Sequence, residues 1–318
     1  MNKQAITLML GAVFLASAAL PSHAFPDRPI TIIVPYAPGT SDQIARGLAS
    51  ELEKTFGQTV SVENKTGGGG SVGAGYVARA KPDGHTLLFS VSSVQTIAPQ
   101  QTRLPYGFDD LQPVSRISIG PNVIAARADA PFKNLPEMVA YAKANPGKVS
   151  YGSSGTGGAT HLAGEALARA AGIKLTHIPF QGAGPAVAAA VGGSVDLGTG
   201  FAQAIMPQVE GKRLVAIAQF GAERAKVLPE VPTFKEGGID LVLPPHTGIW
   251  TAAGTPADVV AKLEKAFADA VKAPAFQALV DKTQTEVGYL NSAQFKEVLV
   301  EENKLFKGLL GEVGLLKQ

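Results

Sequence analysis

The sequence predicts an α/β protein built from two domains, and three observations support this fold class. Short apolar runs alternate with segments of helical periodicity, which is typical of strands and helices packed in layers. The length of 318 residues suffices for two domains of ordinary size. The end of the chain reads as helix throughout. A helical tail after many strand–helix units suggests two α/β domains joined by crossing segments.

The N-terminus predicts a cleaved export signal. After a positively charged start, residues 6–20 are almost continuously apolar, and Ser22 and Ala24 suit the −3 and −1 positions of a cleavage site. A membrane-anchoring helix is the alternative, but the apolar stretch is short against the roughly 20 residues that span a bilayer. We therefore expect residues 1–24 to be a signal peptide that is removed on export.

Strands are predicted where short apolar, β-branched runs lie between turn residues. They are residues 30–35, 60–63, 86–90, 122–126, 149–152, 175–179, 195–199, 214–219 and 248–252.

Helices are predicted where apolar residues recur every three or four positions, as Ile44, Leu48 and Leu52 do. The last helical stretch is expected to begin with Thr255 as N-cap and Pro256 in the first turn. The predicted helices are residues 41–56, 135–144, 160–171, 185–191, 202–210, 256–272, 274–282 and 292–310.

Composition excludes several classes of protein. Lys and Arg number 28 against 26 Asp and Glu, a balance that argues against a nucleic-acid-binding surface. The absence of cysteine excludes disulfides, thiolate metal sites and a lipid anchor on cysteine. A large exported protein without disulfides fits the periplasm of a Gram-negative bacterium.

Three strand-to-helix loops combine small residues with a predicted helix start. The first is VPYAPGTSDQIAR, where Ser41 or Asp42 is expected to cap a helix. The second is YGSSGTGGATH, and the third is IPFQGAGPAV, with Pro185 near the first helical position. Backbone N–H groups at helix starts bind anions, and ligands of open sheets lie beyond the carboxyl ends of strands. These loops are therefore the candidate binding site.

Nucleotide and metal chemistry are poorly supported by the sequence. The Gly-rich turns lack the lysine of a P-loop. Gly68, Gly70 and Gly73 satisfy GxGxxG, but no strand with a ribose-binding acid follows, so residues 67–75 are expected to be a flexible, closely packed turn. The histidines have no metal-ligand spacing, although His161 lies one helical turn before Glu165. No cofactor and no metal are expected.

The sequence resembles the Bug-type extracytoplasmic solute-binding receptors of the tripartite tricarboxylate transporter family over nearly the whole mature chain. The resemblance rests on ordered segments that include FPDRPITIIVPYAPGTSDQIAR, ENKTGGGGSVGAGYVARAKPDGHTLLF, NPGKVSYGSSGTGGATHLAGEALARAAGI, HIPFQGAGPAVAAAVGGSVDL and LPEVPTFKEGG. It implies a two-domain periplasmic-binding-protein fold, each domain a mostly parallel sheet flanked by helices. The expected domains are residues 25–124 with 247–318, and residues 125–246.

The resemblance also implies which residues bind. One carboxylate is expected between the first loop and the second, held mostly by backbone N–H groups, with His161 near enough to donate to it. The residues implied are Ala37, Pro38, Gly39, Thr40, Ser41 and Asp42 on domain 1, Ser153, Ser154, Gly155, Thr156, Gly157 and His161 on domain 2, and Ser90, Ser92, Gln181 and Gly182 around them.

Departures from the family pattern bear on the ligand. Gly200 stands where amino-acid receptors often carry an acid, so a ligand that is not an amino acid is expected. His246 stands where the family often has tryptophan, and is expected at the distal end of a dicarboxylate. Phe201 is expected to stack on a ligand ring.

The expected function is capture of an organic mono- or dicarboxylate by a monomeric receptor, without catalysis, and delivery to the large and small membrane subunits of a permease. A secreted hydrolase that uses Ser153 or Ser154 with His161 is an alternative, since YGSSGTG comes close to the nucleophile motif. A sensing partner of a membrane kinase is another.

Overall fold

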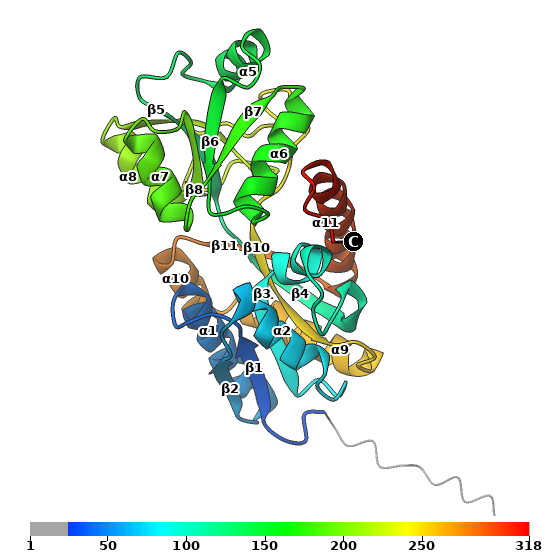
Figure 1. Ribbon diagram of the computed structural model, residues 1–318. Helices are drawn as coiled ribbons and strands as arrows, with labels where there is room; N and C mark the ends of the chain where they lie inside the picture. The colour runs from blue at the N-terminus through cyan, green and yellow to red at the C-terminus, as the bar shows by residue number, and fades with distance from the viewer. Residues whose placement is uncertain (1–24, 318) are drawn as a thin grey trace, which may run out of the picture.

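A six-stranded sheet forms the framework of the first lobe. The computed structural model describes residues 25–317, so the predicted signal peptide lies outside the described residues. The strands follow the order β11-β4-β10-β3-β1-β2, with the lobe at the lower end of Figure 1. They are β1 (Ile30–Val34), β2 (Val60–Asn64), β3 (Thr86–Val91), β4 (Leu111–Ile119), β10 (His246–Ala252) and β11 (Glu286–Leu290). The helices of this lobe are α1 (Thr40–Phe56), α2 (Ser71–Ala78), α3 (Ser93–Thr96), α4 (Ala98–Gln101), α9 (Ala257–Ala270) and α10 (Pro274–Lys282).

A five-stranded sheet, of order β7-β6-β8-β5-β9, forms the second lobe. Its strands are β5 (Asn122–Arg127), β6 (Val149–Ser153), β7 (Leu175–Pro179), β8 (Leu197–Phe201) and β9 (Leu214–Gln219). Its helices are α5 (Leu135–Ala144), α6 (Ala159–Ala171), α7 (Ala183–Val191) and α8 (Ala202–Glu210).

The two-lobed α/β fold is confirmed, but both sheets are mixed rather than mostly parallel. In the first sheet β1 pairs in parallel with β2 and β3, whereas β10 runs antiparallel to β3 and β4. In the second, β5 runs antiparallel to both of its neighbours. Strands β5 and β10 run antiparallel where the chain enters or leaves a lobe without returning through a helix, and β11 adds a further antiparallel strand at the edge beside β4.

The two crossings lie side by side. Residues 120–121 lead from β4 to β5, and residues 243–245 lead back to β10. The Gly120 N–H donates to the Pro245 carbonyl at 2.7 Å, which joins the crossings. They fall close to the expected domain boundaries, although β5 lies as a whole in the second sheet.

Helix α11 (Ser292–Glu312) is a third connection between the lobes. Its first half packs Phe295 and Leu299 into the core of the first lobe. Its second half packs Phe306 and Leu310 into the core of the second lobe. In Figure 1 it runs in red along one side of both lobes. A ligand between the lobes can therefore meet side chains of the C-terminal helix.

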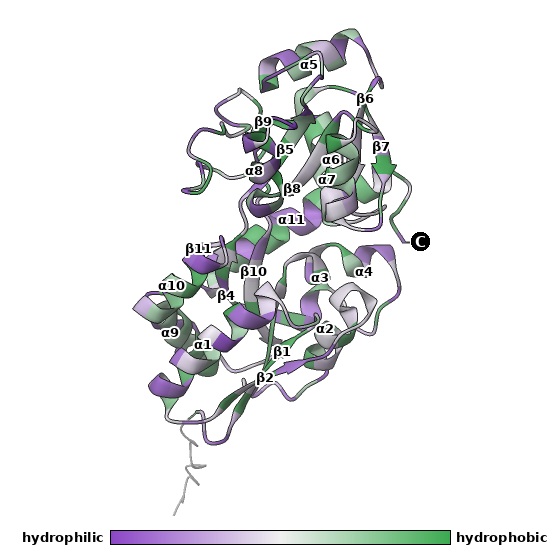
Figure 2. Ribbon diagram, turned by 90° about the vertical axis from the view of Figure 1, so that its left-hand side faces the viewer, coloured by the Kyte–Doolittle hydropathy of each residue, from purple (hydrophilic) through white to green (hydrophobic). Residues whose placement is uncertain are grey.

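Burial explains why the predicted strands and helices form. In β1, Ile32 and Ile33 point to opposite faces and both are fully buried, as expected for a strand covered by helices on both sides. Ile44 and Leu48 place one face of α1 in the same core, and α1 ends at Gly57 in the left-handed conformation. Figure 2 shows the hydrophobic colour along the strands of both sheets and hydrophilic patches on helices such as α1.

Several local predictions are wrong. The end of the chain is not helical throughout, because β11 intervenes. The predicted glycine turn is confined to residues 67–70, where all four glycines have positive φ, because residues 71–75 already belong to α2. The close packing predicted there is present: a Cβ on Gly73 would lie 2.8 Å from the Pro35 Cβ. Thr255 does not cap α9, because its hydroxyl bonds the Ala252 carbonyl and Pro256 is the N-cap.

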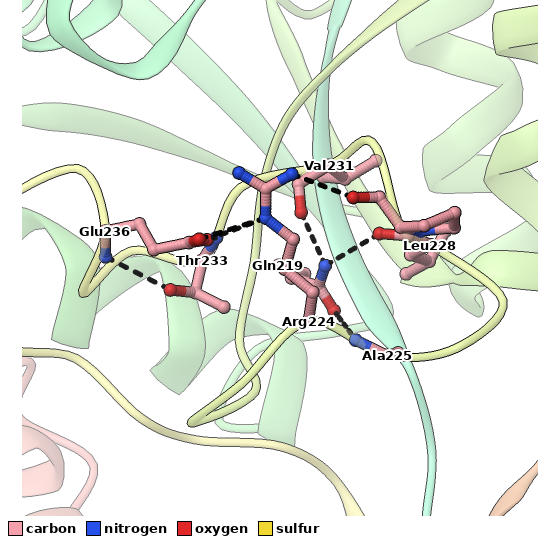
Figure 3. A network of polar contacts seen from close by, with 8 residues as sticks. Gln219, Arg224, Ala225, Leu228, Val231, Thr233 and Glu236 are labelled. Carbon is pink, nitrogen blue, oxygen red and sulfur yellow. Dashed lines mark hydrogen bonds and ion pairs between the residues drawn. The ribbon is translucent and has the colours of Figure 1, made fainter.

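One buried amide orders the long irregular segment after β9. Gln219 donates through Nε2 to the carbonyls of Leu228 and Val231 and accepts the Ala225 N–H (Figure 3). Beside it, Arg224 pairs with Glu236 at 3.0 Å. The segment that returns the chain to the first lobe is thus held by hydrogen bonds, although it has little regular structure. In the described part of the chain, no helix combines the length and the apolar character that crossing a membrane requires.

Candidate functional site

Three cavities lie between the lobes. The largest, of about 630 Å³, meets none of the predicted loops, because it is lined by the crossings, by residues 221–226 and by α11. The other two adjoin each other. One, of about 230 Å³, is lined by Ala159 and Thr160 in the first turn of α6 and is called here the α6-side cavity. The other, of about 430 Å³, is lined by Thr40 and Ser41 in the first turn of α1 and is called the α1-side cavity. Residues common to both walls are Val91, Ser93, Phe201, Pro245 and His246. The two predicted loops therefore face adjoining spaces.

The first loop presents an uncapped helix start. Helix α1 begins at Thr40 with Gly39 as N-cap, and no side chain bonds its first N–H groups. The predicted caps are wrong, because Asp42 is buried and paired with Arg46 at 2.9 and 3.0 Å. These hydrogen bonds from Arg46 hold the pKa of Asp42 below its ordinary value. The start of α1 thus keeps free donors and the positive end of the helix dipole.

Only part of this loop reaches a cavity. Thr40 and Ser41 line the α1-side cavity, whereas Ala37, Pro38 and Gly39 are exposed and line neither cavity.

The second loop, by contrast, is bonded internally. Ser154 N–H donates to the Thr160 hydroxyl at 2.8 Å, and Gly155 N–H to the Ser153 hydroxyl at 3.2 Å. Gly157 N–H donates to His161 Nδ1 at 2.9 Å. These bonds use backbone donors that we expected to face a ligand. Thr156 is exposed, and the cavity is reached by Ser154 and by the start of α6.

His161 accepts a hydrogen bond from the backbone of the second loop and lines neither cavity. It is buried and stacks on His177, with ring centroids 3.7 Å apart and an interplanar angle of 17°. Because Nδ1 accepts the Gly157 N–H, the ring is neutral, and burial lowers its pKa. The expectation that His161 donates to the ligand is therefore not met.

His177 and Ser153 complete this support. His177 Nε2 and Ser153 Oγ lie 2.6 Å apart, and burial lowers the pKa of His177 to about 4. Ser153 is fully buried, and its hydroxyl also bonds the Gly155 carbonyl. The Ser154 hydroxyl is 2.7 Å from that of Thr160. Neither serine is paired with His161 as a nucleophile, so the hydrolase alternative is not favoured.

Of the remaining predicted residues, some line a cavity and others do not. Ser90 is fully buried and bonds the Tyr36 hydroxyl at 2.9 Å, whereas Ser92 lines the α6-side cavity. Gln181 and Gly182 line neither cavity, although Gly182 is the N-cap of α7.

Gly200 and Phe201 lie at the end of β8, where a strand meets the space between the lobes. Gly200 lines the α6-side cavity, and a Cβ there would lie 3.1 Å from Val187 Cγ2. Phe201 borders both cavities and is 43% exposed, so its ring is accessible to a ligand. A Cβ on Gly120 would meet its ring at 2.5 Å, so this glycine makes room for the phenyl group.

Sequence reasoning missed most of the residues that line the two cavities, and three polar ones show why. Tyr36 lies within the first quoted loop and could have been noted there, and Asn122 lies at the start of a predicted strand. Glu302, on α11, has no local signal, because only the folded chain brings that helix to the crossings.

The α6-side and α1-side cavities lack the groups for metal or strong cation chemistry, whereas the third cavity is lined by Arg116, Arg224 and Lys226. No cluster of three His, Cys, Asp or Glu side chains that could hold a metal ion occurs in residues 25–317. None of the side chains lining either cavity, all within the described residues, is a lysine or an arginine. An anion here would meet N–H groups and hydroxyls.

Comparisons with known proteins agree with this geometry. A UPF0065 protein from the TAR-I ttuE-ttuC' intergenic region of Agrobacterium vitis is 38% identical over 277 residues, 86% of this chain and 80% of that protein. The crystal structure of a TctC solute-binding protein from Polaromonas is 30% identical, with a TM-score of 0.83 over 91% of this chain and 99% of that one. MatC from Rhodopseudomonas palustris, solved with bound malate, is 29% identical, with a TM-score of 0.68 over 90% and 100%.

The family model described as "Tripartite tricarboxylate transporter family receptor" matches residues 44–315. Its members are solute-binding receptors and not a class of enzymes. The chain therefore belongs to the tripartite tricarboxylate transporter receptor family, as the resemblance of its loops predicted.

Proposed function

We propose that this protein is a periplasmic receptor that binds an organic carboxylate and delivers it to the large and small membrane subunits of a tripartite transporter. The observation that carries the proposal is the pair of helix starts, Thr40 of α1 and Ala159 of α6, at adjoining cavities without lysine or arginine. Each helix start carries about half a positive charge, which favours a carboxylate without a buried cation.

Closure of the lobes would bring the two helix starts to one carboxylate. They line separate cavities here, with Phe201 and His246 on the shared wall. A ligand that touches both lobes favours the closed form by its higher affinity for that form. On this proposal Thr40, Ser41, Ser154 and the α6 start bind the carboxylate. Ala37, Pro38, Gly39, Asp42, Ser153, Gly155, Gly157 and His161 shape the loops that present those donors.

The ligand is proposed to be a carboxylate other than an α-amino acid. Gly200 supplies no acid for an ammonium group at the end of β8, and the one acid that lines either cavity, Glu302, has a pKa raised to about 7 by burial, which favours its uncharged form. The malate bound to MatC supports an organic acid as the ligand class. Phe201 offers a ring face, so aromatic carboxylates belong in the screen with aliphatic ones.

A thermal-shift screen followed by calorimetric titration tests the proposal. The purified mature chain is screened against aliphatic mono- and dicarboxylates, aromatic carboxylates and amino acids. We expect an increase in Tm with a carboxylate that is not an amino acid, with no turnover of that compound. A response to aspartate or glutamate alone would contradict the ligand class. Consumption of an ester or amide would contradict the receptor.

A further inference from the structure

An acid and an imidazole that line the α6-side cavity each have one buried polar atom without a hydrogen-bond partner. Glu302 on α11 and His246 at the start of β10 both line this cavity, and their Oε1 and Nδ1 atoms lie 3.4 Å apart. The side chain of His246 is 1% exposed and that of Glu302 is 11% exposed. Within the described residues, Glu302 Oε2 and His246 Nε2 are buried and have no hydrogen-bond partner.

His246 Nε2 is a hydrogen-bond acceptor, and Glu302 Oε2 is an acceptor when the acid is ionised and a possible donor when it is protonated. His246 Nδ1 faces two acceptors, the Pro244 carbonyl at 3.3 Å and Glu302 Oε1, so its proton is assigned to Nδ1. Nε2 of the neutral ring then carries a lone pair. Burial lowers the pKa of His246 to about 4, which keeps the ring neutral. Burial raises the pKa of Glu302 to about 7, against the opposite effects of Ser92 and Arg116.

Buried acceptors without donors are costly, and they are rare in native proteins. Replacing Glu302 by an apolar residue would remove the cost, so a group that pairs with the acid in the bound state is the better explanation. A second carboxylate meets like charge when Glu302 is ionised, and it offers His246 Nε2 no donor in either state of the acid. A hydroxyl group donates to either acceptor and also accepts from the protonated acid.

Resting on the proposed carboxylate receptor, we propose that Glu302 and His246 bind a hydroxyl group at the far end of the ligand. The ligand class is then a hydroxycarboxylate. Its carboxylate lies at the helix starts, its hydroxyl lies at the acid and the imidazole, and Phe201 packs against the carbon skeleton between them. The expectation that His246 binds the second carboxylate of a dicarboxylate is replaced by this assignment.

Calorimetric titration of the mature chain with two matched ligand series tests the proposal. The aromatic series is 4-hydroxybenzoate, benzoate and terephthalate, and the aliphatic series is 4-hydroxybutanoate, butanoate and succinate. In the series that fits the cleft, the hydroxycarboxylate should bind at least about tenfold more tightly than the other two members, since unpaired buried polar groups give large discrimination.

Variants assign the effect to the acid. Glu302→Leu should reduce the ratio of affinities for the hydroxylated and unsubstituted ligands to about one, because the acceptor is gone. Glu302→Gln should weaken hydroxycarboxylate binding less than Glu302→Leu does. It should also strengthen dicarboxylate binding, because it removes like charge. Glu312→Gln is the matched control, an exposed glutamate on the same helix that lines none of the three cavities between the lobes. If Glu302→Leu does not fold, the ratio of affinities for the hydroxylated and unsubstituted ligands is measured in His246→Gln instead, and it should also decrease.

Three outcomes decide the matter. A hydroxycarboxylate preference that disappears in Glu302→Leu supports the proposal. A dicarboxylate preference in the wild type, or a preference unchanged by the variant, overturns it and leaves the carboxylate receptor intact. Absence of binding by every carboxylate overturns both.

Discussion

The α1 loop and the α6 loop are similar in composition but differ in whether their backbone N–H groups are hydrogen-bonded within the loop. Both run from a strand through small residues into a helix that lacks a side-chain N-cap. In the α6 loop, Thr160, Ser153 and His161 accept the loop's own N–H groups. In the α1 loop, Asp42 pairs with Arg46 and leaves the helix start unbonded. The α6 loop is thus preorganised, whereas the donors of the α1 loop are free for a ligand.

The difference shows what a run of small and hydroxylated residues can mean. Hydroxyls in such a loop satisfy the backbone as readily as they bind a ligand. In the α6 loop the ligand is left with the start of the helix, and side chains such as Ser153 and His161 hold that start in place. Binding should therefore be most sensitive to changes at Thr40, and folding most sensitive to changes beneath the α6 loop.

The largest expected effect is on binding at the α1 start. Thr40→Asp places a carboxylate at the positive helix end, which favours the helix and repels an anionic ligand. We expect affinity to fall on the order of 100-fold, the result of like charge in a partly enclosed site. Thr40→Ser keeps the hydroxyl and is the control. Calorimetry that gives equal affinities for both variants would contradict a ligand at this helix start.

Stability should decrease on acidification because of the histidines beneath the α6 loop. The pKa of His177 is lowered to about 4, and that of His161 is also lowered. The unfolded chain takes up protons first, so this stability is fully present above pH 6.5 and is lost as pH falls towards 4. From these histidines we expect a loss of about 1–2 kcal/mol. His246, whose pKa is also lowered to about 4, acts in the same direction, and Glu302, whose pKa is raised, acts in the opposite direction below pH 7.

Urea unfolding of the wild type and of His177→Gln, at pH values between 7.5 and 4.5, checks this sign. The variant should show the flatter profile. If the unfolding free energy of the wild type rises on acidification, or if that of the variant falls as steeply as that of the wild type, His177 is not the group responsible for the pH dependence.

A matched pair of hydroxyl deletions separates the loops. Thr160→Val leaves the half-buried Ser154 N–H and the Ser154 hydroxyl without their partner and should cost about 1–2 kcal/mol of unfolding free energy. Ser41→Ala touches no internal hydrogen bond and should cost less than about 0.5 kcal/mol. Chemical denaturation measures both. Equal costs would mean that the loops are not organised differently.

The smallest expected effect concerns the bond across the lobes. Gln101 Nε2 donates to the Gly157 carbonyl of the α6 loop at 2.8 Å. In Gln101→Ala the lobes lose one neutral hydrogen bond, and we expect affinity to change by about threefold. Titration of the same ligand measures it. A change beyond tenfold would show that this contact controls closure.

Local signals in the sequence predicted much of the fold. The apolar run of β1 and the periodic Ile44, Leu48 and Leu52 of α1 carry their own pattern, and both elements form as predicted. Strand β4 was missed because Pro113 and Arg116 interrupt its alternation, and its partners β10 and β11 lie far along the chain. Such pairing is set by tertiary structure and leaves little local trace.

The candidate site was predictable as loops but not as side-chain roles. The helix starts at Thr40 and Ala159 follow from strand–loop–helix order. That His161 turns back to Gly157 depends on a ring stacked from another strand. Glu302 lines the cavity because α11 packs against both lobes. No sequence motif near Glu302 predicts that position.

A crystal structure with the tightest-binding ligand from the screen tests the central claim most directly. The account predicts one carboxylate with its oxygens about 3 Å from backbone N–H groups in the first turns of α1 and α6. A carboxylate bound instead to lysine or arginine side chains, or a ligand seated outside the α6-side and α1-side cavities, would contradict it.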